Sequence, residues 1–247
     1  MKKLLLLLFV FTISQTAFSQ KISHAFAGEI IFGSSNAEYT ADGSGALGTN
    51  KAGQIQDALR FTIWFHVGYY THIDFNKNFG IYTGLVNRNV GFISKEMPSE
   101  TGLTDRVKWK RRAYTLGVPL AIKFGNLEKG MYIFVGAQYD MLYHYKEKEF
   151  LPTGKRKYTK WFSDRVNMFL PSVFGGITFP GGLSVKFTYE LGDMMNKDFK
   201  INTTAGEIKP YENMNSRMFY TSVYSMLTWS DTYSEITKEE KKLMAEY

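Results

Sequence analysis

The chain contains no cysteine among its 247 residues. A disulfide framework, a thiolate metal site, a cysteine nucleophile and a lipidated N-terminal cysteine are therefore excluded. Proline is also scarce, with 6 residues against 22 glycines, 16 tyrosines and 20 phenylalanines. A composition that is 44% hydrophobic and 16% aromatic excludes a disordered chain and favours strands.

Long hydrophobic runs are missing as well. The apolar stretch 4–13 follows Lys2 and Lys3 and is too short to cross a membrane as a helix. With the small residues that follow, it predicts a secretory signal peptide of residues 1–19, whose removal lowers the formal charge from +7 to +5. No later run reaches the roughly 18 apolar residues of a spanning helix. We therefore expect an exported protein that is either soluble or a β-barrel.

Hydrophobic residues alternate with small or polar residues over long segments. Residues 60–75 keep this period of two over sixteen positions, and residues 114–125 and 183–192 repeat it. An alternation of this length exceeds the usual strand of a soluble domain. One face of each segment is continuously apolar, which is typical of strands that face lipid on one side and line a barrel on the other.

Eight strands can be placed along the chain, and the connections between them are alternately long and short. The strands are expected at about 25–34, 59–75, 79–93, 107–124, 130–146, 166–179, 182–192 and 217–229. Long outer loops that alternate with tight turns predict an all-β fold, an eight-stranded antiparallel up-and-down transmembrane β-barrel over residues 20–229. A lipocalin-like soluble barrel is the main alternative.

The polar face of the predicted strands carries several charged or titratable residues. Because eight strands enclose a space just wide enough for side chains, we expect these residues to form a mutually paired network in the lumen, with a proton or ion path as the alternative. They are Glu29, Arg60, His66, His72, Lys123, Asp140, His144, Lys186 and Glu190. Lys123 is expected to pair with one of the acids Glu29, Asp140 and Glu190. Pro119 lies on the same face, so an irregular strand pairing is expected there.

The sequence offers little for catalysis. His66 and His72 share a strand face, but six residues of strand place them about 20 Å apart, too far to bind one metal ion. No zinc-protease or serine-hydrolase motif occurs. We therefore expect no catalytic, metal or cofactor site, although a Ser-His-Asp arrangement built from different strands stays open.

Basic residues cluster beside tryptophan in two predicted outer segments. At the membrane surface they are expected to contact the phosphates of lipopolysaccharide or a protein partner, with ordinary solvated loop charge as the alternative. An outer-membrane location excludes nucleic acid as a partner despite a pI near 9.3. The residues are Lys108, Trp109, Lys110, Arg111, Arg112, Lys155, Arg156 and Lys157.

The chain continues beyond the last predicted strand as a tail, residues 230–247. Residues 237–240, with the sequence T-K-E-E, form a capping-box pattern that predicts a short periplasmic helix. Leu243, Met244 and Tyr247 would then offer apolar anchors for a partner. A frayed tail is the alternative, because isolated helices this short are marginal in water.

Two segments resemble one family of membrane proteins. Residues 116–125, with the sequence L-G-V-P-L-A-I-K-F-G, are similar to the strand L-E-I-P-L-L-L-K-F-G of the PorT-like outer-membrane β-barrels of Bacteroidota. Residues 187–194, F-T-Y-E-L-G-D-M, are similar to the penultimate strand of that family. Gly117 stands where the family usually has Glu, so an ion pair made by that Glu is absent. The resemblance implies an outer-membrane location and, as for some members, an accessory role in protein secretion.

Together these observations predict a non-enzymatic outer-membrane protein. We expect a scaffold or accessory subunit of an envelope complex, in protein secretion or outer-membrane protein assembly. Its expected partners are outer-membrane lipids, lipopolysaccharide and other envelope proteins. A narrow transporter or ion pore is the alternative, and an outer-membrane enzyme is the third possibility.

Overall fold

The computed structural model describes residues 21–35, 37–39, 43–45, 48–50, 53–54, 56–63, 66–98, 106–203 and 206–229. The predicted signal peptide and the predicted C-terminal tail, with Leu243, Met244 and Tyr247, lie outside these residues. The regular elements of the described residues are strands. Among the same residues, no helix is long and apolar enough to cross a membrane.

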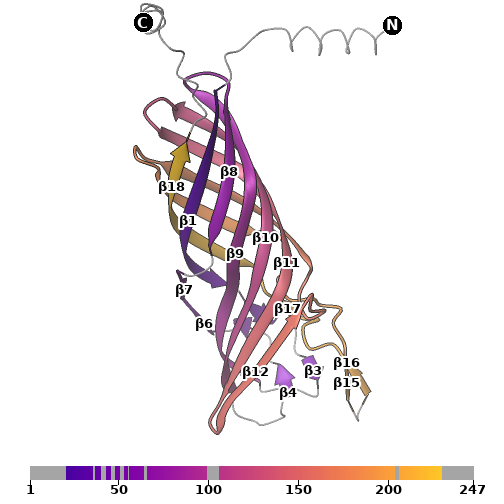
Figure 1. The fold of residues 1–247 in the computed structure, drawn as a ribbon. Helices are drawn as coiled ribbons and strands as arrows, with labels where there is room; N and C mark the ends of the chain where they lie inside the picture. The colour runs from indigo at the N-terminus through magenta and orange to yellow at the C-terminus, as the bar shows by residue number, and fades with distance from the viewer. Residues whose placement is uncertain are drawn as a thin grey trace, which may run out of the picture.

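Eight strands close into an antiparallel barrel (Figure 1). The ring closes through the ladder between the first and last strands, which runs from His24 opposite Trp229 to Ser35 opposite Met218. The predicted fold class is therefore confirmed. In order around the ring the strands are β1 (Lys21–Ser35), β8 (Val67–Asp74), β9 (Phe79–Pro98), β10 (Arg106–Asn126), β11 (Met131–Leu151), β13 (Phe169–Thr178), β14 (Leu183–Glu190) and β18 (Met218–Trp229).

The two ends of the barrel differ, and we call them the turn end and the loop end. At the turn end, short connections join β8 to β9, β10 to β11 and β13 to β14. The last of these contains Gly181 and Gly182 with φ of +87° and +85°, a conformation that glycine adopts without strain. Small strands lie on the loop-end side: β2 (Glu38–Tyr39), β3 (Gly43–Gly45), β4 (Gly48–Asn50), β5 (Gly53–Gln54), β6 (Gln56–Ala58), β7 (Arg60–Thr62), β12 (Gly154–Trp161), β15 (Ile201–Thr203), β16 (Gly206–Ile208) and β17 (Met214–Asn215).

Three neighbouring strands are about twice as long as a membrane requires. β9, β10 and β11 have 20, 21 and 21 residues, whereas β8, β13 and β14 have 8, 10 and 8. A tilted transmembrane strand needs about 9–11 residues. The surplus, residues 90–98, 106–113 and 145–151, projects from the loop end on one side of the barrel, with β6 and β12 at its edges. We call this sheet the extension.

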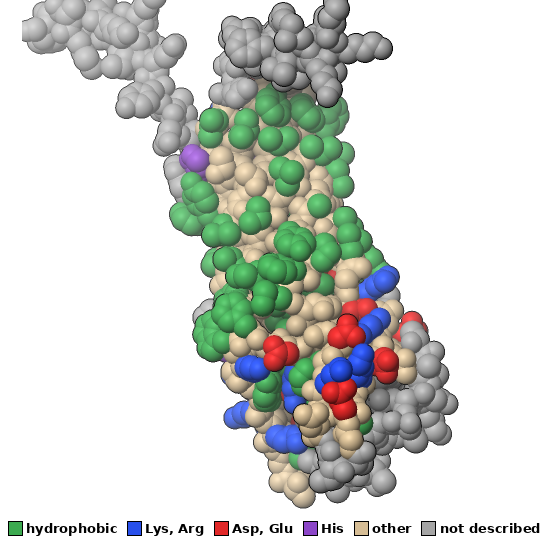
Figure 2. All heavy atoms as spheres, turned by 90° about the vertical axis from the view of Figure 1, so that its right-hand side faces the viewer, with side chains coloured by type: hydrophobic (Ala, Val, Ile, Leu, Met, Phe, Trp, Pro, Cys, Tyr) green, Lys and Arg blue, Asp and Glu red, His purple; other side chains and the backbone are tan. Residues whose placement is uncertain are grey.

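The outside of the barrel is an apolar belt. In β10 the outward residues from Leu116 to Phe124 are hydrophobic and 37–62% exposed, while the residues between them are buried. Figure 2 shows apolar side chains over the barrel on one face, with charged side chains gathered towards the loop end. Lysines and carboxylates are costly in hydrocarbon, so this separation marks the part of the barrel that faces lipid.

A β-bulge in β11 changes which of its residues face inward. Thr115 of β10 lies opposite Leu142, but Tyr114 lies opposite His144, which leaves Tyr143 as an extra residue. Before the bulge the even-numbered residues of β11 are buried inside, and after it the odd-numbered ones, beginning with Tyr145, are buried. One inserted residue has this effect because side chains alternate with a period of two.

The pairing of β9 with β10 is irregular at Pro119, as the sequence predicted. Gly117 lies opposite Val86 and Leu120 opposite Thr83, and the positions between them are unpaired. Proline has no N–H to donate to the ladder. The Thr83 hydroxyl donates instead to the Pro119 carbonyl oxygen at 2.8 Å, which joins the two strands across the gap.

Candidate functional site

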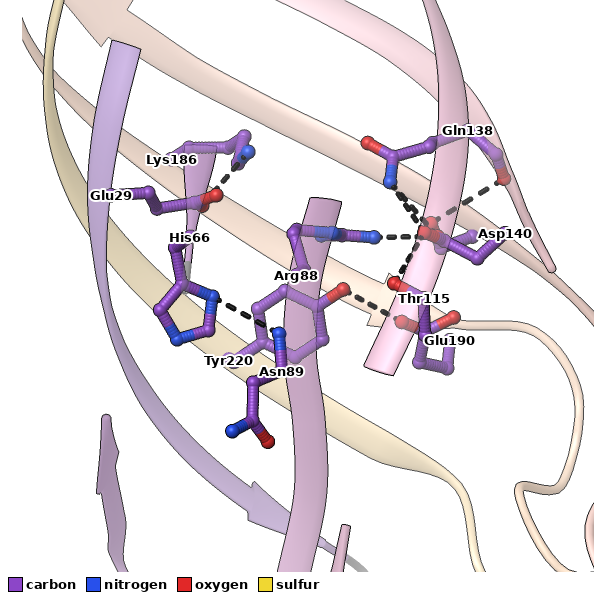
Figure 3. A network of polar contacts seen from close by, with 11 residues as sticks. Glu29, His66, Arg88, Asn89, Thr115, Gln138, Asp140, Lys186, Glu190 and Tyr220 are labelled. Carbon is purple, nitrogen blue, oxygen red and sulfur yellow. Dashed lines mark hydrogen bonds and ion pairs between the residues drawn. The ribbon is translucent and has the colours of Figure 1, made fainter. Parts of the chain in front are cut away.

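A network of charged side chains fills the middle of the barrel (Figure 3). Arg88 Nη2 of β9 lies 2.5 Å from Asp140 Oδ2 of β11, and Lys186 Nζ of β14 lies 2.9 Å from Glu29 Oε1 of β1. All four residues are at most 7% exposed. The Arg88 guanidinium also lies 5.2 Å from the centre of the Tyr220 ring. Buried charges are tolerated when they are paired in this way, so the centre of the barrel is occupied by an ion-paired layer.

Neutral groups complete the hydrogen bonding of this central layer. Asp140 accepts hydrogen bonds from the Thr115 hydroxyl at 3.0 Å and from the Gln138 amide at 2.9 Å. Tyr220 donates its hydroxyl proton to Glu190 Oε1 at 2.7 Å. These bonds link β10 to its neighbour β11 and β14 to its neighbour β18. The two ion pairs join strands that are not adjacent, so they carry the contacts across the interior.

An aromatic layer lies next to the central layer, on the side of the turn end. The Tyr82 ring centre lies 5.8 Å from that of Phe134 and 6.4 Å from that of Phe174, and Phe134 lies 6.4 Å from Tyr224. Edge-to-face and offset contacts of this kind are favourable. Lys186 Nζ lies 5.2 Å from the centre of the Tyr224 ring, so the two layers are in contact. This level of the interior is occupied by packed aromatic rings.

A second charged group lies at the turn end. Lys123 Nζ is 2.5 Å from Asp74 Oδ1 and 3.1 Å from His72 Nδ1. A cavity of about 440 Å³ opens beside them, with Tyr132 among its lining residues. His72 and Lys123 thus face the interior as predicted, but in a layer separate from the central one.

The predicted pairing of Lys123 with Glu29, Asp140 or Glu190 is wrong. Lys123 lies eight residues along β10 from Thr115, which contacts Asp140. At about 3.3 Å per residue that separation is about 26 Å along the strand. The aromatic layer lies between the two levels. The shared strand face predicted correctly that the side chain points inward, but it did not predict its level along the barrel axis.

Arg60 and His66 border a gap in the barrel wall instead of joining the central layer. β7 pairs with β1, and in the described part of the chain no ladder joins β7 to β9. Side chains replace the missing ladder: Arg60 donates to the backbone oxygen of Asn89 at 2.9 Å and to its Oδ1 at 2.5 Å. The Asn89 N–H donates to His66 Nδ1 at 3.2 Å. Both residues are buried, and both form hydrogen bonds with the backbone of Asn89 at the edge of β9.

His144 lies on the outer surface, so its predicted place in the lumen is wrong. Its ring centre is 4.6 Å from Trp161 and 5.4 Å from Tyr114, at the outer edge of the apolar belt. The prediction assumed regular alternation along β11, and the bulge at Tyr143 breaks it. Tyr145 takes the inward position instead.

The inner face of the extension packs on loop residues at the loop end. Trp109, Phe92 and Leu142 from the long strands are fully buried there. The connection between β12 and β13 contributes Val166 to the same apolar core, and the connection between β14 and β18 contributes Met194, Met195, Tyr211 and Met214. The loop end therefore has a hydrophobic core of its own, beyond the membrane-spanning part of the barrel.

Glu147 lies at the centre of the polar contacts of this core. Arg165 lies in the connection between β12 and β13, and its Nη1 is 2.5 Å from Glu147 Oε1. The Tyr145 hydroxyl donates to Glu147 Oε2 at 2.7 Å. Arg111 Nε lies 3.8 Å from the same Oε2, and its guanidinium stacks 4.5 Å from the Trp109 ring. These contacts fasten the loop to the extension.

The eight predicted rim residues divide between the two faces of the extension. Trp109 and Arg111 are buried on the inner face, so their predicted contact with lipid or a surface partner is wrong. Arg156 also belongs to the inner face, where its Nε lies 2.8 Å from Glu149 Oε2. The other five lie on the outer face with two lysines that the sequence analysis missed; the outer-face set is Lys108, Lys110, Arg112, Lys146, Lys148, Lys155 and Lys157.

Arg88, the cation at the centre of the barrel, could not be identified from the sequence. The inward face of β9 carries Val86 and Val90 on either side of Arg88, so polarity did not identify that face as the inner one. Within the described part of the chain, no three His, Asp or Glu side chains form a group that could hold a metal ion.

A closed ring of antiparallel strands, an apolar outer belt and an interior filled with polar and aromatic side chains define a transmembrane β-barrel. Two crystal structures of Ail, the attachment invasion locus protein of Yersinia pestis, are similar to this chain at 9% sequence identity; one is a complex with the heparin analogue sucrose octasulfate. Each alignment covers 85% of this chain and 97% of Ail, with TM-scores of 0.31 for the complex and 0.30 for Ail alone. At these TM-scores the similarity carries no argument about activity or partners. Searches of protein-family models and of curated proteins gave no match.

Proposed function

We propose that the protein is an integral, non-enzymatic barrel of the outer membrane that serves as a scaffold or accessory subunit of an envelope complex. The observation that carries this proposal is the filled interior. Paired charges, aromatic rings and the core under the extension occupy successive levels of the barrel. Such an interior supports a structural role better than the passage of solutes.

The orientation follows from the connections. In outer-membrane barrels the short turns lie in the periplasm and the long loops lie outside the cell. We therefore place the turn end in the periplasm and the extension at the cell surface. The predicted signal peptide and the resemblance to PorT-like barrels support export to this membrane, and protein secretion or outer-membrane protein assembly is the process we propose.

The extension supports the scaffold role directly. Its three long strands are held by a buried apolar core and by the contacts of Glu147, so it presents a fixed surface outside the membrane. Fixed surfaces bind partners without a large loss of conformational entropy. In the periplasm, the predicted anchors Leu243, Met244 and Tyr247 are the segment that we propose contacts a second envelope protein.

Conductance across planar bilayers tests the scaffold proposal. The purified full chain should give no steady current under conditions where a general porin, as positive control, conducts. A stable open channel would contradict the proposal. It would favour the second candidate, a narrow transporter or ion pore, for which the 440 Å³ cavity beside Lys123 is the supporting observation.

Co-purification tests the accessory role. The tagged full chain, extracted from membranes with mild detergent, should retain at least one envelope protein. A variant without residues 234–247 keeps all eight described strands of the barrel and should lose the periplasmic partner. If the full chain retains no envelope protein, the accessory role is wrong, and a stand-alone barrel is left.

A further inference from the structure

Cations on the outer face of the extension lie directly opposite one another on neighbouring strands. Lys110 of β10 is in register with Lys148 of β11, which is in register with Lys157 of β12. Arg112 is likewise opposite Lys146. Like charges in directly opposed positions destabilise a sheet. The stability of the folded sheet therefore does not account for these opposed cations.

No acidic side chain compensates these cations within the described residues. None of the seven outer-face cations takes part in an ion pair there, and the carboxylates of β11, Glu147 and Glu149, face the inner side. Partial burial and then the neighbouring cations lower the pKa of Lys110, and the same two causes lower the pKa of Lys148. Both lie in the extension, outside the membrane-spanning part of their strands. An anion would relieve the repulsion.

A pocket of about 380 Å³ lies at the membrane side of these cations, at the gap between β7 and β9. Its lining combines positive charge with an apolar side. The residues are Arg60, Lys110, Arg112, Asn89 and Tyr114 together with Phe61, Thr62 and Ile63. The pocket is therefore suited to a molecule that has both an anionic group and a hydrocarbon part.

Arg60 points to the same conclusion independently of the lysines. It is 3% exposed, yet the partners of its guanidinium are neutral oxygens of Asn89 and Gly91. Its Nε has no hydrogen-bond partner. A buried cation is costly unless it is paired with an anion. Arg60 in this pocket lacks the negative charge that its burial calls for.

The pocket lies at the level of lipid head groups. Phe61 and Ile63 at its apolar side are 52% and 47% exposed, as expected for side chains that face hydrocarbon. The row of Tyr114, His144 and Trp161 marks the edge of the belt, where aromatic residues of membrane barrels gather. Arg112 follows this row directly on the outer side.

We propose that this pocket binds the phosphate group of an anionic lipid of the outer leaflet. The phosphate contacts Arg60, Lys110 and Arg112, and the acyl chains lie along Phe61 and Ile63. Phosphate oxygens suit guanidinium and ammonium donors at these positions. The remaining outer-face cations extend the site towards further phosphates of neighbouring head groups. The inference rests on the outer-membrane location proposed above, and it adds a ligand class and a binding site.

Lipid retention by the detergent-purified full chain tests this site. The probes are diphosphorylated lipid A, dephosphorylated lipid A and inorganic phosphate, with bound lipid measured by native mass spectrometry. The test variant is Lys110→Ser with Arg112→Ser. Lys77→Ser with Lys129→Ser removes the same charge from exposed positions at the turn end and is the matched control.

Wild type and control should bind diphosphorylated lipid A equally, and the test variant should bind it at least about tenfold more weakly. Added salt should weaken binding by wild type. Equal retention of dephosphorylated lipid A, or inorganic phosphate bound as tightly as the lipid, would overturn the proposal. If the test variant does not fold, as judged by heat-modifiable migration on gels, Lys146→Ser with Lys148→Ser must give the same direction of change, and unchanged binding overturns the proposal.

The outcomes separate this inference from the proposed function. A barrel that retains its envelope partner and conducts no current but shows no preference for phosphorylated lipid overturns the lipid site alone. A barrel that binds the lipid but conducts current or retains no envelope protein overturns the scaffold and accessory role alone.

Discussion

Arg88 and Asp140 form an ion pair across the interior, from β9 to β11, although β10 separates these strands in the ring (Figure 3). Ladder hydrogen bonds link only adjacent strands. A contact between strands that are not adjacent therefore holds the cross-section of the barrel, which the ladders alone do not define.

Replacement of Arg88 should destabilise the barrel strongly. Arg88→Met leaves Asp140 buried without its cation, which should lower the free energy of unfolding by about 3–5 kcal/mol. Urea titration in lipid vesicles, followed by the heat-modifiable band on gels, measures this loss. Lys77→Met at the exposed turn should change stability by less than about 0.5 kcal/mol. Arg88→Met combined with Asp140→Asn should recover part of the loss, and no recovery would contradict the pairing.

The turn-end pair should contribute less. Lys123→Met should lower the free energy of unfolding by about 1–3 kcal/mol, because Asp74 is 15% exposed and water from the cavity can solvate it. A double-mutant cycle of Lys123 with Asp74 should show coupling, measured by the same urea titration. The cycle of Lys123 with Asp140 should show none; coupling there would place Lys123 in the central layer.

Loss of the Glu147 carboxylate should loosen the loop without opening the barrel. Glu147→Gln removes the charge that holds Arg165 and Arg111. Protease added to intact cells should cut the connection between β12 and β13, which contains Arg165, about tenfold faster, which corresponds to a local loss of about 1.4 kcal/mol. The heat-modifiable band should stay. Glu128→Gln, at an exposed position of the turn end, is the control. In this variant the protease should cut the same connection at the wild-type rate.

Orientation can be tested with single cysteines, because the chain has none of its own. Thr153→Cys lies between β11 and β12 at the loop end, and Asn78→Cys lies between β8 and β9 at the turn end; both positions are exposed. A membrane-impermeant maleimide should label Thr153→Cys on intact cells and Asn78→Cys only after lysis. The reverse result would mean that the barrel is inserted the other way round.

Much of the fold could be predicted from the sequence because lipid imposes a strict pattern on a strand. An outward residue must be apolar, so the alternation in residues 114–125 identifies both the strand and its outer face. The tight turns around Gly181 added the hairpins. Outside the belt this constraint ends, and the sequence no longer revealed that β9, β10 and β11 continue as one sheet.

The interior was harder to predict because inward positions accept many kinds of side chain. Arg88 lies between valines that are also buried, and Trp109 and Arg111 carry features that are usual for a surface. Depth is a further difficulty, as the pairing of Lys123 shows. Contacts across the barrel depend on the relative stagger of strands far apart in sequence, which local patterns do not contain.

The single extra residue at Tyr143 determines the sign of the charge on the outer surface. Residues 146–149 read Lys-Glu-Lys-Glu, so one strand face is cationic and the other anionic. With the bulge, the lysines face outward and the glutamates meet Arg165, Arg111 and Arg156 inside. In an unbulged strand of the same sequence the two faces would be exchanged, with carboxylates outside and lysines against the apolar core. A one-residue insertion or deletion near this position therefore exchanges the two faces of the strand beyond it. Such a change reverses the sign of the surface charge without altering any charged side chain.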